Sequence, residues 1–145
     1  LCGLNIREIA RAYVTSETTI GQRITRAKKK IKDTKISFEV PVAEQLTIRL
    51  PSVLKVIYLI YNESYTAYEG QTLTRQDLAK EAIRLSLLMV KLIPNPEVYG
   101  LAALILFHDA RRLSRSSIIE TYIPLELQDR RLWDQDKVKQ ADASD

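Results

Sequence analysis

The sequence predicts an all-α protein in which a helix-turn-helix module is followed by a bundle of helices. Apolar residues recur at intervals of three and four along most of the chain, which is the period of an amphipathic helix. Glycine and proline, which most often interrupt helices, number only 4 and 5 among 145 residues. Hydrophobic residues make up 46% and charged residues 28%, a composition typical of a globular chain.

Residue counts exclude several classes of protein. The longest apolar run, residues 98–107, is well short of the ~20 residues that a membrane span needs. One cysteine and one histidine allow neither an intrachain disulfide nor a Cys/His zinc site. We therefore expect a cytoplasmic protein with no cofactor, no metal and no membrane contact. Because the chain begins at Leu1 without a signal sequence, we interpret it as an interior part of a longer protein.

Basic residues are concentrated in the first quarter of the chain. Residues 1–37 contain nine lysines and arginines and three acidic residues, which gives a net charge of +6, whereas the remainder has 13 basic and 15 acidic residues. Lysine and arginine displace counterions from phosphates, so a patch of this kind is typical of nucleic-acid-binding modules. A solvated face is the alternative explanation of the charge.

The first 33 residues predict two helices joined by a short turn. Apolar positions in residues 6–13 follow helical spacing, and Asn5 is in position to cap this helix. Val14 and Thr15 interrupt the pattern, and the Ser16 hydroxyl can accept a hydrogen bond from a free N–H at the start of a second helix. The apolar residues that share one face of the second helix are Ile20, Ile24, Ala27 and Ile31.

The opposite face of the second helix is expected to meet DNA. Small polar residues near its start are placed to reach base edges in the major groove, and glutamine has the paired donor and acceptor that suit adenine. Basic residues of the same helix are better placed to bind phosphates. The alternative is a surface hairpin made basic for solubility. The predicted DNA-binding residues are Ser16, Thr18, Thr19, Gln22, Arg23, Arg26, Lys28, Lys29 and Lys30.

Residues 3–13 and 16–31 resemble the helix-turn-helix of region 4 in bacterial sigma factors of the extracytoplasmic-function (ECF) group. In that family the module recognises the −35 promoter element, so the resemblance implies promoter DNA and core RNA polymerase as partners. The resemblance covers roughly the first 33 residues. Its most specific part is the pattern of Thr19, Ile20, Arg23, Ile24, Arg26 and Ala27.

Two residues depart from the usual helix-turn-helix pattern. Val14 stands where many such proteins place a turn glycine, and because valine at positive φ is strained, we expect the turn to use another geometry. Gly21 stands in the recognition helix, where a polar or basic residue is usual. It removes one candidate contact and costs about 1 kcal/mol of helix propensity relative to alanine.

A linker is expected over residues 33–42, which lose helical periodicity and contain Pro41. We place the domain boundary there. Residues 1–37 form the helix-turn-helix module, truncated at its N-terminus, and residues 38–145 form an incomplete helical extension. In the extension, helices are expected over residues 43–50 and 51–62, with Pro51 at the first position of the second.

A longer pair of helices follows, over residues 74–93 and 97–113, joined by Pro94-Asn95-Pro96. So short a connection predicts an αα-hairpin like those of tetratricopeptide (TPR) repeats. Leu85 and Leu104 are expected at the centres of its facing apolar stripes. Residues 114–125 are expected to form a loop or short hairpin, residues 128–138 a further helix, and residues 141–145 a frayed end.

Five segments resemble the helical, TPR-like C-terminal extension of one ECF sigma-factor subgroup, and the resemblance runs from about residue 43 to residue 133. The resemblance implies a full-length protein with an upstream region 2 and further TPR-like helices downstream. The segments, which occur in the family's order, are residues 58–65, 82–85, 96–104, 108–112 and 127–134.

No catalytic constellation accompanies these motifs, so we do not expect an enzyme. His108 and Asp109 lie near Arg111 and Arg112, and residues 129–134 are also charged, but neither a phosphate-binding glycine loop nor a metal-ligand spacing is present. We expect instead an ion-pair network that holds the last helix to the bundle.

The expected function is that of a promoter-recognising sigma factor. The alternatives are a one-component transcription regulator, whose helical domain senses a ligand or partner, and a TPR-like interaction module. In the fragment, the isoleucines on the inner faces of the first two helices must find cover on the extension or on a second copy of the chain, so a homodimer is a further expectation.

Overall fold

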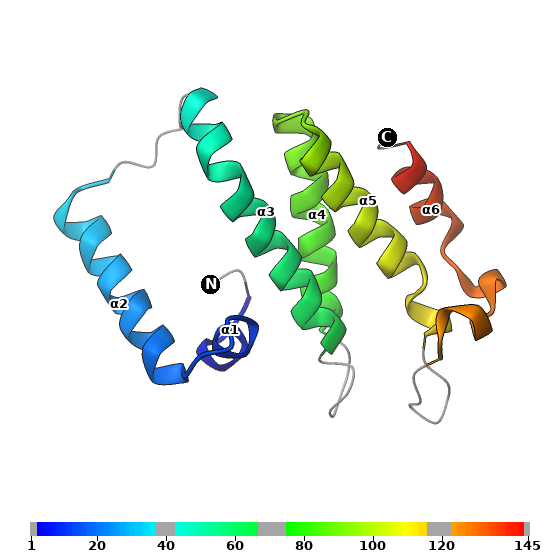
Figure 1. Ribbon diagram of the computed structural model, residues 1–145, viewed down its shortest axis with the longest axis horizontal. Helices are drawn as coiled ribbons and strands as arrows, with labels where there is room; N and C mark the ends of the chain where they lie inside the picture. Colours follow the sequence, from blue (N-terminus) through cyan, green and yellow to red (C-terminus); the bar gives the residue numbers. More distant parts are fainter. Residues whose placement is uncertain (1–2, 37–42, 67–74, 116–122, 144–145) are drawn as a thin grey trace. The chain divides into compact units, whose positions relative to one another are not determined.

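The computed structural model describes residues 3–36, 43–66, 75–115 and 123–143. These residues form α-helices and short 3-10 helices, with no strand among them, which confirms the predicted all-α fold (Figure 1). The α-helices, in chain order, are α1 (Ile6–Ala12), α2 (Glu17–Asp33), α3 (Ala43–Thr66), α4 (Gln76–Leu92), α5 (Pro96–Ala110) and α6 (Gln135–Asp142).

The chain divides into two compact units, residues 1–53 and 54–145, and the division falls inside α3. The sequence predicted two helices separated at Pro51, but α3 is one helix of 24 residues with Pro51 inside it. Pro51 is exposed, and as a proline inside a helix it contributes no backbone N–H to the helical hydrogen bonds. The boundary predicted at residue 37 lies outside the described residues and stays a prediction.

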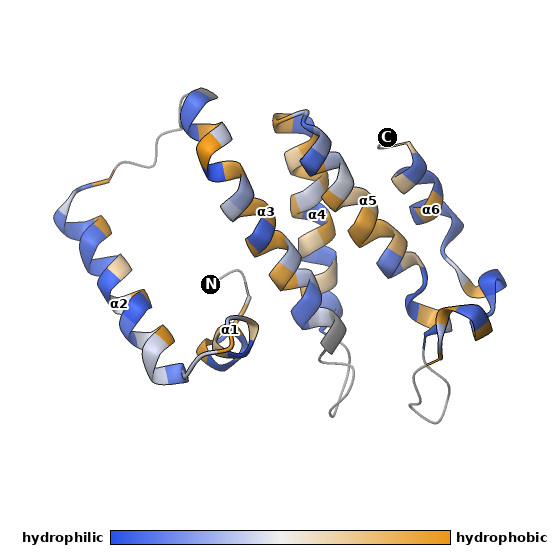
Figure 2. Cartoon of the chain, viewed as in Figure 1, coloured by the Kyte–Doolittle hydropathy of each residue, from blue (hydrophilic) through white to orange (hydrophobic). Residues whose placement is uncertain are grey.

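In the first unit, α1 packs against α2 as the sequence predicted. The two helices bury Ala10 and Ile20, which are 3% and 4% exposed. Ile24 is half-buried, while Ile6 and Ile31 remain exposed, so the inner face is less completely covered than its apolar pattern suggests. The rest of α2 is mostly hydrophilic (Figure 2).

The second unit contains the predicted αα-hairpin, made of α4 and α5, which pack against each other. Residues 93–95 connect them, and Asn95 caps α5 by accepting a hydrogen bond of 2.8 Å from the backbone N–H of Glu97. Pro96 occupies the first turn, where its missing N–H has no helical partner to lose. The predicted start of α4 at Thr74 lies outside the described residues.

The predicted centre of the core face of α5 is wrong. Leu104 is 43% exposed, and Leu85 in α4 is only half-buried. The buried side of α5 instead passes through Ala102, Ile105 and Leu106. Because α5 is apolar on nearly every side (Figure 2), the spacing of its apolar residues does not mark the face that packs.

The structure confirms the predicted ion-pair network that holds the last helix, α6, to the bundle. Its central residue is Lys137, which the sequence did not indicate. Lys137 Nζ of α6 lies 2.8 Å from Oδ2 of Asp109 in α5 and 3.0 Å from Oδ2 of Asp134. Burial alone lowers the pKa of Lys137, but the hydrogen bonds to both carboxylates outweigh it and leave the pKa raised. Asp129 instead pairs locally with Arg131, at 2.8 Å on the surface.

The chain's last segment differs from the expectation in two ways. Residues 130–132 form a short 3-10 helix, and α6 begins only at Gln135, because Asp134 caps it by accepting a hydrogen bond from the N–H of Lys137. The end is not frayed at Ala141, which is 1% exposed. The loop predicted over residues 114–125 lies mostly outside the described residues.

Candidate nucleic-acid interface

The turn between α1 and α2 has a specific backbone geometry that the sequence analysis rejected. Val14 has φ = 50°, in the left-handed region. Its N–H donates to the carbonyl of Arg11 (3.1 Å), and the N–H of Thr15 donates to the carbonyl of Ala10 (2.9 Å). This pair of hydrogen bonds is the Schellman motif, which ends a helix and usually has glycine at the position that Val14 holds. The expectation of another geometry was therefore wrong.

The physical reason is that the hydrogen bonds of the turn outweigh the strain of one residue. A β-branched residue at positive φ is disfavoured by roughly 1 to 3 kcal/mol. The two bonds satisfy carbonyls at the end of α1 that would otherwise lack partners. Val14 is also 93% exposed, so its side chain clashes with no neighbouring element.

The start of α2 is capped as the sequence predicted. Ser16 Oγ accepts a hydrogen bond of 3.1 Å from the backbone N–H of Thr19. The same oxygen lies 2.8 Å from Thr19 Oγ1, so the two hydroxyls bind each other. Ser16 and Thr19, both predicted to contact DNA, therefore hold the end of the helix in place, while Thr18 beside them is exposed.

The start of α1 is also capped by a side chain, and here the capping is reciprocal. Asn5 Oδ1 accepts from the N–H of Glu8 at 2.9 Å, and the Glu8 carboxylate accepts from the N–H of Asn5 at 2.7 Å. This reciprocal capping box satisfies two N–H groups at once. Both helices are thus fixed at their starts by side chains from their own sequence.

The outer face of α2 carries Thr18, Gln22 and Lys29. With 3.6 residues per turn, these positions lie about opposite Ile20, the buried residue of the helix. All three are exposed. Thr25, on the same side, is directed back to the helix, because its hydroxyl donates to the carbonyl of Gly21 at 2.9 Å. The exposed polar groups of this face are free of packing against α1.

The predicted phosphate-binding residues do not all share one side of α2. Arg23, Arg26 and Lys30 fall on one flank of the helix, whereas Lys28 falls on the other. All four side chains are exposed. A helix with its polar face in a groove has phosphates on both sides, so this division suits the predicted role.

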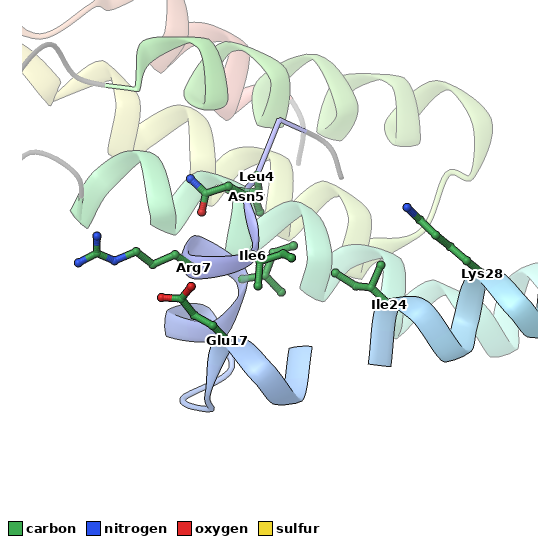
Figure 3. Close-up of a pocket in the computed structure, with 8 residues that line it drawn as sticks. Leu4, Asn5, Ile6, Arg7, Glu17, Ile24 and Lys28 are labelled. Carbon is green, nitrogen blue, oxygen red and sulfur yellow. The ribbon is translucent and has the colours of Figure 1, made fainter. Parts of the chain in front are cut away.

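A groove on the inner side of the two helices was not expected from the sequence. It has a volume of about 540 Å³ and an apolar floor that includes Leu4, Ile6 and Ile24. Figure 3 shows Arg7 and Glu17 near one end and Lys28 at the other. The signal for this groove is the apolar face of residues 6–13, which α2 covers only in part, since Ile6 is exposed and Ile9 half-buried.

The described residues of the chain were expected to lack a metal site, and their acidic, histidine and cysteine side chains are dispersed. In the described parts of the chain, no group of three or more histidine, cysteine, aspartate or glutamate side chains could hold a metal ion. Among the helices in the described ranges, none combines the length and the apolar character of a membrane span.

The single histidine of the second unit has a perturbed pKa. Burial lowers the pKa of His108, and the positive charges of Arg111 and Arg115 lower it further.

A capped helix-turn-helix in one unit and a helical bundle in the other define the structural class of this protein. Residues 49–144 match DUF6596, a family of unknown function. Since this match covers more than half of the chain, the chain belongs to the DUF6596 family. The matched region contains the whole second unit apart from its last residue and does not include the helix-turn-helix.

A curated relative extends the similarity to nearly the whole chain. An uncharacterized protein of Rhizobium meliloti (strain 1021) is 44% identical over 140 residues, which cover 96% of this chain. The chain spans only 33% of that relative's length. No solved structure matches.

Proposed function

We propose that this chain is part of a promoter-recognising sigma factor, in which α2 reads the −35 element and the whole protein directs RNA polymerase to promoters. The observation that carries the proposal is the arrangement of α2. Its capped, exposed polar face lies opposite the buried Ile20, and basic residues lie on both flanks. The resemblance of the first 33 residues to sigma region 4 supports the same function.

In this proposal, the residues of α2 have separate tasks. Gln22 and Thr18 contact base edges, and Gln22 has the donor and acceptor that adenine presents in complementary positions. Arg23, Arg26, Lys28, Lys29 and Lys30 bind phosphates and set the position of the helix in the groove. Ser16 and Thr19 act through the cap, because their hydroxyls already bind each other and the helix start. The protein performs no chemistry of its own and acts in the cytoplasm.

The test of this function is association with core RNA polymerase. We expect the protein that carries this chain to copurify with core polymerase and to support transcription from its own promoter in a purified system. Gln22→Ala should reduce promoter-specific transcription while leaving the association with polymerase intact. A purified protein that binds DNA but never binds core polymerase would contradict the proposal.

The second candidate is a one-component regulator, whose helix-turn-helix binds an operator while the helical unit responds to a ligand. A pocket in the second unit, between residues of α3 and α5, favours this candidate. The association experiment separates the two functions, because a one-component regulator binds its operator without core polymerase.

A further inference from the structure

The second unit contains a pocket with a volume of about 250 Å³ that no part of the DNA-reading function uses. Its floor is well buried, since Tyr61 is 5% and Ile105 0% exposed. Its rim is open, since Tyr58 and Leu104 are each 43% exposed. The residues that line it, three from α3 and three from α5, are Tyr58, Tyr61, Asn62, Leu104, Ile105 and His108.

The lining favours an uncharged occupant with a ring. It contains two phenol rings, one imidazole and two aliphatic side chains, but no carboxylate, lysine or arginine. His108 is held toward its neutral form by burial and by the nearby Arg111 and Arg115, which lower its pKa. A charged ligand would lose hydration here without gaining an opposite charge from the lining.

The polar groups of the pocket are few and can orient such a ligand. The Asn62 amide carries both a donor and an acceptor, and a neutral imidazole also offers one of each. Sites for small molecules commonly combine apolar and aromatic walls with a small number of polar groups that fix orientation. Asn62 belongs to α3 and His108 to α5, so the polar groups of the pocket come from two different helices.

The volume limits the size of the ligand. An apolar protein cavity of about 150 Å³ holds one benzene molecule, whereas drug-sized ligands occupy sites of about 300 Å³ or more. A volume of about 250 Å³ therefore fits one or two fused rings with a small polar substituent.

We propose that this pocket binds a small, uncharged aromatic molecule of one or two rings, in contact with Tyr58, Tyr61 and Ile105 and with its polar edge directed to Asn62 and His108. The proposal concerns the second unit alone and does not rest on DNA binding. It gives this unit a function of its own, the capture of a metabolite-sized ligand.

Indole is a suitable probe, and the chain provides its own reporter. His108 is the single histidine of the sequence, so its imidazole Hε1 proton gives one resolved signal in a proton NMR spectrum. Titration with indole should move this signal in a saturable way, with a dissociation constant of about 1 mM or lower, as expected for a ligand of this size. A linear, unsaturated response up to the solubility of indole would overturn the proposal.

Two variants and one control locate the binding. Leu104→Trp places a larger side chain on the open rim of the pocket and should weaken indole binding at least about tenfold. Leu113→Trp, at a 65% exposed position outside the pocket, should leave it unchanged. Tyr58→Ala removes a rim ring and should also weaken binding. Because Tyr58 is exposed, this variant keeps the test valid if Leu104→Trp does not fold, which circular dichroism will show.

Matched probes test the chemistry of the ligand. Phenol should bind more tightly than cyclohexanol, which has the same number of heavy atoms but no aromatic ring. N-acetyltryptophanamide, which carries indole on a peptide-like group, should bind more weakly than indole. Tighter binding of N-acetyltryptophanamide would show a site for a protein side chain, and equal binding of phenol and cyclohexanol would show no aromatic preference. Either result would overturn the proposal.

Discussion

The two units of this protein are stabilised in different ways. In the second unit, α4 and α5 bury large apolar side chains such as Leu78, Ile105 and Leu106, each at most 1% exposed. In the first unit, fewer apolar side chains are buried: α1 and α2 bury Ala10 and Ile20, and the start of α3 buries Leu50. Because apolar burial contributes roughly in proportion to area, local hydrogen bonds make up a larger share of the first unit's stability.

This difference agrees with the functions proposed for the two units. A DNA-reading helix must keep its outer face polar and exposed, which limits how much of it can be buried. The capping groups Asn5 and Ser16 and the turn at Val14 fix the two helices without covering that face. The second unit has no such requirement and can form a conventional core.

The largest expected effect concerns the core of the second unit. Ile105→Ala should lower the free energy of unfolding by about 2 to 5 kcal/mol, because the side chain is fully buried. Ile31→Ala in α2, where the side chain is 45% exposed, should lower it by less than about 1 kcal/mol. Urea unfolding of both variants measures the contrast, and equal losses would contradict the difference between the units.

The second prediction concerns the attachment of α6. Asp109→Ala should destabilise the protein by about 2 to 3 kcal/mol, since Asp109 is buried and accepts a hydrogen bond from charged Lys137. Glu81→Ala is the matched control, because the Glu81–Arg84 pair lies on the surface of α4 and should contribute nothing measurable. Thermal unfolding distinguishes the two variants. A similar melting temperature in both would mean that the network does not hold α6.

The ion pairs of Lys137 should stabilise the protein over a defined range of pH. Hydrogen bonding to Lys137 lowers the pKa of Asp134, so its contribution to stability is present above the ordinary value of 3.8 and is lost as pH falls. The raised pKa of Lys137 means that its contribution is present below 10.5 and is lost as pH rises further. Between these limits the stabilisation by the Asp134–Lys137 pair should be constant with pH.

A third prediction concerns the turn of the helix-turn-helix. Val14→Gly should raise the free energy of unfolding by about 1 kcal/mol, because glycine adopts φ = 50° without strain. Val14→Ala keeps a Cβ at positive φ and should gain less. Chemical unfolding followed by circular dichroism measures both variants. A loss of stability in Val14→Gly would show that the valine side chain makes a contribution beyond the turn geometry.

The smallest expected effect comes from His108. Burial lowers its pKa, so the folded state favours the neutral ring, and stability should decline as pH falls below 6.5, the ordinary pKa. His108→Gln should remove this part of the pH dependence. Melting temperatures between pH 7.5 and pH 5.5 will show it, and identical profiles for the two proteins would contradict the burial of a neutral histidine.

The sequence predicted most of the fold because the decisive signals are local. Asn5 and Ser16 were identified as caps, and the connection containing Asn95 predicted the hairpin of α4 and α5. The core face of α5 could not be predicted, because apolar residues surround that helix and only its neighbours decide which side is buried. The role of Lys137 depends on Asp109, 28 positions earlier in the chain, and no local pattern reports such a contact.

The candidate interface was predicted in part. The exposed positions of Gln22, Arg23 and Arg26 follow from helical periodicity. Ser16 is the cap that the sequence predicts, and its pairing with Thr19 gives Thr19 a part in the same cap, which the sequence did not predict. The positive φ of Val14 was rejected on intrinsic preference, because the hydrogen bonds that offset the strain form only when the turn is complete.

The most direct test of DNA reading by α2 is binding of the protein to double-stranded promoter DNA across a series of salt concentrations. The affinity should fall as salt rises, and Arg23→Ala and Arg26→Ala should each reduce the slope of log K against log salt by about one unit. Gln22→Ala should keep the slope and change base preference by about 1 to 3 kcal/mol at one position. Lys91→Ala, an exposed lysine of α4, is the control and should change neither. Salt-independent binding, or equal effects of the arginine and lysine variants, would contradict the account.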